Sequence, residues 1–229
     1  VPLAIERVPV VIGALALVIA FATPSLSRRL LDRGPAIYGR ESMNRRELHN
    51  FLRGLGAEQL TFDEGWNAVI SVWRNGGATW LKSNGKSDAS SVADMNTQVM
   101  VGLLPAAVHP APKRAFIIGF GSGATARTVA DVPGIERIDL VEIERAVLRA
   151  APQLAMINGD VLRDPRLHVI EDDARSARQL SRAPYDIIVA EPTNPWIAGV
   201  AALFTRDFFR VVDAHLAADG VFSQWVQTY

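Results

Sequence analysis

The stretch AFIIGFGSG, residues 115–123, decides the fold of this chain. A short apolar run of this kind is typical of a strand buried on both faces. Glycines let the backbone approach a ligand closely, and the N-terminus of a following helix offers unpaired N–H groups. We therefore interpret Gly119, Gly121, Ser122 and Gly123 as a nucleotide-binding turn of the type found in NAD, FAD and S-adenosylmethionine sites. A tight strand-to-helix turn without a ligand is the alternative.

Strands and helices alternate downstream of this turn. The further strand signals are RIDLVE (137–142), LHVI (167–170), YDIIVAE (185–191) and VFSQWV (221–226). An apolar stripe at Val147, Ala151, Leu154 and Ala155 predicts a helix, and Thr205 is the expected N-cap of another. Five strands with helices between them predict an α/β fold with a doubly wound parallel sheet, as in S-adenosylmethionine-dependent methyltransferases. Ligands of such folds bind at the carboxyl ends of the strands.

Acidic residues follow the second and third predicted strands. Glu142 ends the second strand, where a carboxylate can accept hydrogen bonds from ribose hydroxyls. Asp172 and Asp173 follow the third strand, where a carboxylate can accept a hydrogen bond from the adenine amino group. Helix N-capping is the alternative role for either aspartate. Together with the glycine turn, these acids favour S-adenosylmethionine over NAD.

The fourth strand ends in EPTNPW, residues 191–196, where a doubly wound sheet places its reacting centre. The two prolines stiffen this loop. Glu191 is positioned to take a proton from a nucleophile. Trp196 either forms a wall of the pocket or packs against the neighbouring proline.

A small antiparallel sheet is predicted before the main domain. Residues 67–74 and 78–82 are strand signals separated by an Asn-Gly-Gly turn, and Asn84-Gly85 is a second turn signal. Met95–Leu104 is predicted to form an apolar helix that ends before Pro105.

The N-terminal region contains an apolar run from Val8 to Thr23. We expect a transmembrane helix here. A signal peptide cleaved near Ala20-Phe21-Ala22 and a buried soluble helix are the alternatives. The arginines that follow, at 28, 29 and 33, would hold this end in the cytoplasm. The expected location is therefore the inner (cytoplasmic) membrane, with the catalytic domain facing the cytoplasm.

Four regions are expected from these patterns: a transmembrane helix over 1–23, a linker over 24–58, a small β-sheet and helix over 59–105, and a cofactor-binding α/β domain over 106–229 that is C-terminally incomplete. The formal net charge is zero, which argues against a nucleic-acid partner. Cysteine is absent, and the 4 histidines share no metal-binding spacing, so no metal is expected. The sequence is also compatible with a homodimer.

Over roughly residues 61–229 the chain resembles the spermidine synthase (polyamine aminopropyltransferase) family, and most closely the bacterial proteins in which a membrane region precedes this domain. The matching stretches are LKSNGKSDAS, DMNTQ, PKRAFIIGFGSG, VEIE, DPRLHVIEDDAR, YDIIVAEPTNPW and LFTRDFF. The resemblance implies transfer of an aminopropyl group from decarboxylated S-adenosylmethionine to a small-molecule amine, without a metal.

The resemblance also implies roles for individual residues. Gly119, Gly121 and Gly123 match the cofactor loop, Glu142 the ribose-binding acid and Asp173 the acid that contacts adenine. Glu191 matches the proton acceptor, and Gln98 matches a residue beside the reacting groups.

Three acidic residues of the family pattern are neutral here, at Ser122, Asn194 and Asn84. Ser122 replaces an acid that helps to hold the aminopropyl ammonium, and Asn194 replaces one that pairs with the acceptor amine. Because charged hydrogen bonds are about twice as strong as neutral ones, we expect weaker polyamine binding. Two further functions therefore remain open: an S-adenosylmethionine-dependent methyltransferase, and a non-catalytic module that binds a nucleoside or polyamine.

Overall fold

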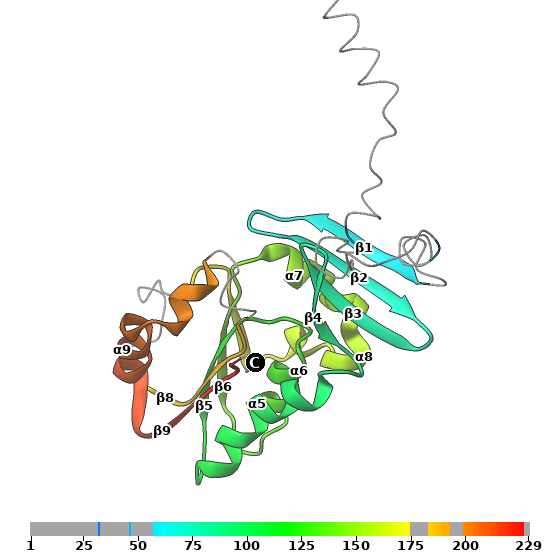
Figure 1. Cartoon of the computed structure of the whole chain (residues 1–229). Helices are drawn as coiled ribbons and strands as arrows, with labels where there is room; N and C mark the ends of the chain where they lie inside the picture. Colours follow the sequence, from blue (N-terminus) through cyan, green and yellow to red (C-terminus); the bar gives the residue numbers. More distant parts are fainter. Residues whose placement is uncertain (1–31, 33–45, 47–56, 175–182, 193–198, 227–229) are drawn as a thin grey trace, which may run out of the picture.

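The computed structural model describes Asp32, Arg46 and residues 57–174, 183–192 and 199–226. These residues form a small antiparallel sheet and a larger α/β unit (Figure 1). The predicted apolar helix over Val8–Thr23 and the predicted pocket residues Asn194 and Trp196 lie outside the described residues. Within the described part of the chain, no helix is both long and apolar enough to span a membrane.

The small sheet has four antiparallel strands in the order β1-β2-β3-β4. They are β1 (Glu58–Glu64), β2 (Val69–Asn75), β3 (Ala78–Ser83) and β4 (Lys86–Ser90). Both predicted turns are confirmed as two-residue hairpin turns, since Gly76-Gly77 and Asn84-Gly85 all have positive φ angles. Strands β1 and β4 were not predicted. They lie at the two edges of the sheet, and their polar sequences carry no continuous apolar signal.

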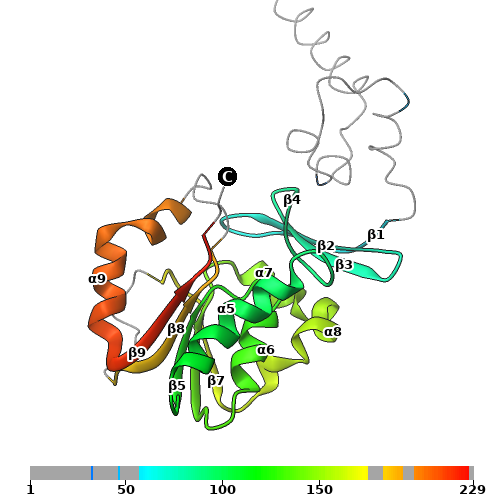
Figure 2. The same cartoon turned by 60° about the horizontal axis from the view of Figure 1, so that its bottom comes forward.

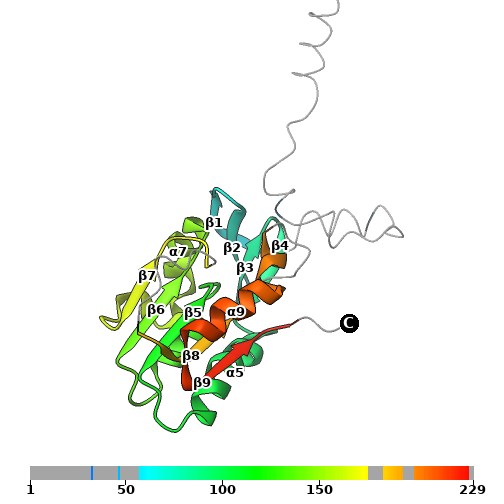
Figure 3. The same ribbon diagram turned by 90° about the vertical axis from the view of Figure 1, so that its left-hand side faces the viewer.

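The larger sheet is parallel and has the order β7-β6-β5-β8-β9 (Figure 3). Its strands are β5 (Arg114–Ile118), β6 (Arg137–Val141), β7 (Leu167–Ile170), β8 (Tyr185–Ala190) and β9 (Leu216–Gln224). The strand order reverses beside β5, which confirms the predicted doubly wound sheet. A crevice at the carboxyl ends of β5 and β8 is the place where such sheets bind ligands.

Helices cover both faces of the parallel sheet (Figure 2). Phe116 and Ile118 of β5 pack toward Phe208 of α9 (Arg206–His215), whereas Ile117 packs toward Val129 of α6 (Ala124–Ala130). Alternate residues of one strand therefore contribute to two apolar layers. The remaining helical elements are α5 (Met95–Val108), α7 (Arg145–Ala150), α8 (Ala155–Asn158) and the 3-10 turns Ala151–Leu154, Val161–Arg163 and Val200–Phe204.

The helix predictions are partly correct. Thr205 caps α9, because its side chain accepts a hydrogen bond from the Phe208 N–H. The stripe at Val147, Ala151 and Leu154 is buried, but Pro152 divides the predicted helix into α7, a 3-10 turn and α8.

The prediction that Pro105 stops a helix was wrong, because α5 continues to Val108. Pro105 is buried on the same face as Gln98, Val101 and Gly102. A proline has a helical φ, but inside a helix it removes one N–H donor and its ring crowds the carbonyl four residues earlier. Packing of this face against α6 therefore outweighs the loss of one helical hydrogen bond.

Candidate active site

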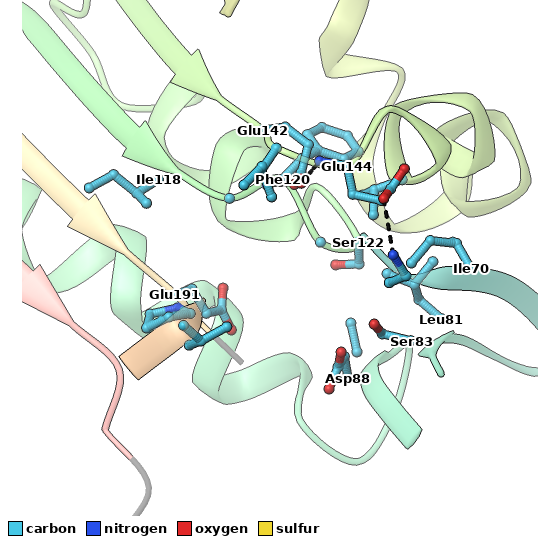
Figure 4. Close-up of a pocket in the computed structure, with 18 of the residues that line it drawn as sticks. Ile70, Leu81, Ser83, Asp88, Ile118, Phe120, Ser122, Glu142, Glu144 and Glu191 are labelled. Carbon is cyan, nitrogen blue, oxygen red and sulfur yellow. Dashed lines mark hydrogen bonds between the residues drawn. The ribbon is translucent and has the colours of Figure 1, made fainter. Parts of the chain in front are cut away.

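A cavity of about 1020 Å³ lies between the two sheets. One wall is formed by the carboxyl ends of β5, β6 and β8, and the other by side chains of β2, β3 and β4 (Figure 4). It is the crevice that the strand order predicts, closed on its second side by the small sheet. Among the predicted site residues, Gln98, Gly119, Gly121, Ser122, Glu142, Asp172, Asp173 and Glu191 line it.

The glycine turn adopts the backbone that its sequence predicts. Gly119, Gly121 and Gly123 have φ angles of 88°, 54° and 84°. At Gly123 an added Cβ would also lie 2.5 Å from Cζ of Phe120 and 2.6 Å from Cβ of Asn158. A side chain at this position would therefore meet both an unfavourable φ and two buried neighbours.

Glu142 is buried beneath the turn. Its carboxylate accepts hydrogen bonds from the backbone N–H groups of Phe120 and Glu144, each at 2.8 Å. Burial raises the pKa of Glu142, and these two backbone hydrogen bonds offset part of that rise. The carboxylate thus braces the glycine turn and also lines the cavity. This bracing role was not predicted from the sequence.

Glu191 lies at the end of β8 and enters a hydrogen-bond network with α5 and α6. The Thr125 hydroxyl lies 2.6 Å from Oε2 of Glu191 and 2.8 Å from the backbone carbonyl of Gln98. The Ser122 hydroxyl donates to Oε1 of Gln98, whose amide nitrogen donates to the Ser90 carbonyl. The structure therefore brings together three predicted site residues, Glu191, Gln98 and Ser122.

The pKa of Glu191 is raised to about 7, chiefly because burial disfavours the charged carboxylate. The hydrogen bond with Thr125 opposes this rise, and the negative charge of Asp94 adds to it. A carboxyl with a pKa near 7 exchanges protons readily at neutral pH, as a general base must. This property and the position at the strand end are both consistent with the predicted role of Glu191.

Asp172 and Asp173 are half-buried at the end of β7 and line the cavity. The Asp173 N–H donates to Oδ1 of Asp172 at 2.7 Å. Asn84, where the family pattern has an acid, accepts a hydrogen bond from the Val69 N–H. Its side chain thus supports the β3–β4 turn.

The cavity is strongly acidic despite the neutral residues at 84 and 122. Among the described lining residues there are seven carboxylates and one cation, Lys86. The carboxylates belong to Asp88, Asp94, Glu142, Glu144, Asp172, Asp173 and Glu191. Sequence reasoning missed Asp88, Asp94 and Glu144 as site residues, although all three lie inside the stretches that carry the family resemblance. A cavity with this charge suits a cationic ligand.

Glu144 joins the two walls of the cavity. Its Oε2 accepts hydrogen bonds from the backbone N–H groups of Asn67 at 2.8 Å and Ala68 at 3.2 Å, in the turn between β1 and β2. Its Oε1 accepts one from the Ala146 N–H, which caps α7. One carboxylate therefore positions the small sheet relative to the α/β unit.

No group of three or more potential metal ligands occurs among the described residues. The polar side chains that line the cavity offer chiefly carboxylates, amides and hydroxyls.

A family model described as the spermine/spermidine synthase domain matches residues 95–228, and the chain belongs to this family. A polyamine aminopropyltransferase from Moorella thermoacetica is 36% identical over 124 residues, which cover 54% of this chain and 43% of that protein. One from Nitrosomonas europaea is 33% identical over 126 residues, or 55% of this chain and 38% of that protein. The chain spans less than half the length of these relatives.

Solved structures of the family share the fold. A spermidine synthase in complex with the transition state analogue AdoDATO superimposes with a TM-score of 0.67 and 26% identity, over 72% of this chain and 57% of that one. Spermidine synthase from Thermotoga maritima gives a TM-score of 0.64 and 25% identity, over 72% of this chain and 56% of that one. The family resemblance seen in the sequence and the fold of parallel sheet with small antiparallel sheet are therefore confirmed.

Proposed function

We propose that this chain is an aminopropyltransferase that moves an aminopropyl group from decarboxylated S-adenosylmethionine to a small-molecule amine. The observation that carries the proposal is the position of Glu191, with a pKa raised to about 7, in an acidic cavity beside the glycine turn. The names of the relatives and the bound analogue in the superimposed spermidine synthase support the same chemistry.

The nucleoside would occupy the wall formed by the glycine turn. Gly119 and Gly121 leave room for close approach of the ligand to the backbone. Glu142 would accept hydrogen bonds from the ribose hydroxyls, and Asp172 and Asp173 would lie toward adenine. The sulfonium and the acceptor amine, both cationic, would then lie among Asp88, Asp94 and Glu191.

In the reaction, an ammonium group of the acceptor gives one proton to the Glu191 carboxylate. The lone pair freed on nitrogen attacks the methylene carbon next to the sulfonium, and the new N–C bond forms as the C–S bond breaks. The electron pair of that bond stays on sulfur, so methylthioadenosine leaves as a neutral thioether. Positioning of the two reactants supplies much of the acceleration. The acceptor amine would also be bound by Gln98, Asn194 and Trp196.

Isothermal titration with decarboxylated S-adenosylmethionine, S-adenosylmethionine and methylthioadenosine tests the nucleoside site. Binding of at least one is expected, and binding of none would refute the proposal. Mass spectrometry of the nucleoside product then identifies the transferred group. Methylthioadenosine indicates aminopropyl transfer, whereas S-adenosylhomocysteine indicates a methyltransferase. Ligand binding without any product indicates a binding module.

We further propose that residues 1–23 anchor the protein in the inner membrane, that 24–58 link this anchor to the small sheet, and that the α/β domain begins near residue 106 and faces the cytoplasm. The apolar run and the arginines after it support this arrangement. Fusions of cytoplasm-active and periplasm-active reporters at Tyr229 test it. Activity of the periplasmic reporter alone would overturn the topology. Sedimentation of the full chain measures whether it forms a homodimer.

A further inference from the structure

The strand β4 presents an ion pair to the cavity. Nζ of Lys86 lies 2.5 Å from Oδ1 of Asp88, and both side chains line the cavity opposite the nucleoside wall. Their side-chain exposures are 22% and 18%. The surface pair of Lys113 and Glu136 has 62% and 65%. The β4 pair is therefore enclosed in the cavity and does not resemble a pair on a solvated face.

Asp88 lies two residues from Lys86, on the same side of β4, and the pairing of β3 with β4 is irregular at this point. In the register of the two strands, Leu81 pairs with Ala89 and Lys82 pairs with Ser87, so Asp88 is the extra residue of a β-bulge. A bulge redirects a side chain that regular alternation would turn to the other face. As a result, Asp88 and its neighbour Ala89 both line the cavity. Figure 4 shows Asp88 close to Ser83, across the cavity from Glu191.

Lys86 is a single cation among the described lining residues of an otherwise acidic cavity, and this calls for a functional reason. A ligand with ammonium groups alone would be attracted by Asp88 and repelled by Lys86. A ligand with one ammonium and one carboxylate on the same carbon carries a charge opposite to each member of the Lys86–Asp88 pair. Its ammonium would donate to Asp88, and its carboxylate would accept from Lys86.

We propose that Lys86 and Asp88 form a subsite for the α-amino acid group of a ligand. Two sources of this group fit the cavity: the intact methionine end of S-adenosylmethionine, or an amino acid that acts as acceptor. The inference rests on the proposed function because it concerns the same cavity. It differs in substrate class, since neither a decarboxylated nucleoside nor a simple diamine carries the carboxylate.

Titration of the full chain with matched ligands tests the subsite. S-adenosylmethionine and its decarboxylated form differ only in the carboxylate, and so do ornithine and putrescine, which are titrated in the presence of methylthioadenosine. If the donor carries the group, the parent binds S-adenosylmethionine at least as tightly as the decarboxylated form. If the acceptor carries it, ornithine binds more tightly than putrescine.

Two variants separate the halves of the subsite. Lys86→Met should weaken the carboxylate-bearing ligand by about ten- to a hundredfold while changing its decarboxylated counterpart by less than about threefold. Asp88→Asn should weaken both ligands of a pair, because both carry the ammonium. Lys113→Met, at the surface ion pair, is the control and should change neither.

The outcomes distinguish this inference from the proposed function. If the decarboxylated ligand of each pair binds more tightly and Lys86→Met weakens neither carboxylate-bearing ligand selectively, Lys86 only neutralises Asp88 and the subsite is refuted, while the transferase proposal stands. If none of the three nucleosides binds to the parent, the proposed function itself fails. Circular dichroism of each variant verifies that a loss of binding is not a loss of fold.

Discussion

The Thr125 hydroxyl lies 2.6 Å from the Glu191 carboxylate, although the two residues are 66 positions apart in the chain. The same hydroxyl lies 2.8 Å from the backbone carbonyl of Gln98. A hydroxyl has one proton and can donate to only one of these acceptors. Donation to the Glu191 carboxylate stabilises its ionised form, so Thr125 lowers the pKa of that carboxyl against the rise that burial causes. Protonation of Glu191 leaves the hydroxyl free to donate to the Gln98 carbonyl instead.

The proposed proton-acceptor role of Glu191 predicts a specific dependence of rate on pH. The carboxyl must be ionised to accept a proton, so kcat/KM should rise with pH and level off above a pKa of about 7. Glu191→Gln should lower the rate by about 10²–10⁴-fold and abolish this dependence. Initial rates of nucleoside release from pH 5 to 9 measure both effects. Glu58→Gln, at an exposed position on β1, should keep the parent profile.

The stability of the protein should depend on pH through the same carboxyl. The pKa of Glu191 is raised from 4.5 to about 7 in the folded state, so folding favours the protonated form. The stabilisation of the folded state by protonated Glu191 is fully present below pH 4.5 and is lost as pH rises toward 7. The stability of Glu191→Gln relative to the parent should therefore increase across this window, by at most about 3 kcal/mol. Urea unfolding of both proteins at pH 5 and 8 tests the sign, and an unchanged difference would contradict it.

Thr125 should act on the reaction through Glu191. Its hydrogen bond lowers the pKa of that carboxyl, so Thr125→Val should move the pH–rate profile to higher pH and reduce kcat more than it changes KM. Thr125→Ser retains the hydroxyl and should restore the parent profile. If the profile of the valine variant superimposes on that of the parent, Thr125 serves only packing.

Two glycines of the glycine turn, Gly121 and Gly123, should differ in their tolerance of a side chain. Both have positive φ, but an added Cβ at Gly121 meets nothing within 4 Å, whereas at Gly123 it meets Phe120 and Asn158. Gly121→Ala should therefore lower the free energy of unfolding only through the strained left-handed backbone, by about 1–2 kcal/mol. Gly123→Ala should lower the free energy of unfolding by that amount and by about 1–3 kcal/mol more, because the new methyl group overpacks the site. Thermal unfolding of the two variants gives the comparison, and equal costs would argue against steric exclusion by Phe120.

The features that could be predicted from the sequence are local. The parallel strands are apolar runs such as residues 115–118, and Glu142 and Glu191 stand out because they follow such runs directly. The edge strand β4 has the sequence KSDAS, in which hydrophobicity gives no signal. That the neighbours Asp88 and Ala89 both line the cavity depends on a bulge, and therefore on the register between two strands, which a single chain does not display.

Contacts between residues far apart in the chain could not be predicted from the sequence either. Glu144 was seen only as part of a family motif, because two of the N–H groups that it accepts from lie 76 and 77 residues earlier in the chain. The Pro105 prediction failed for a related reason. A local rule about proline was outweighed by packing of the α5 face against a helix that comes later in the sequence.

The bridge at Glu144 has a consequence for how the substrate range of such a protein can change. The nucleoside wall and the β3–β4 hairpin belong to separate sheets with separate hydrogen-bond ladders. Under the proposed function, grafting the β3–β4 hairpin of a relative onto this chain should replace the residues opposite Glu191 while the glycine turn and its bracing by Glu142 stay intact. A ligand preference set by the hairpin would then be able to drift independently of that turn.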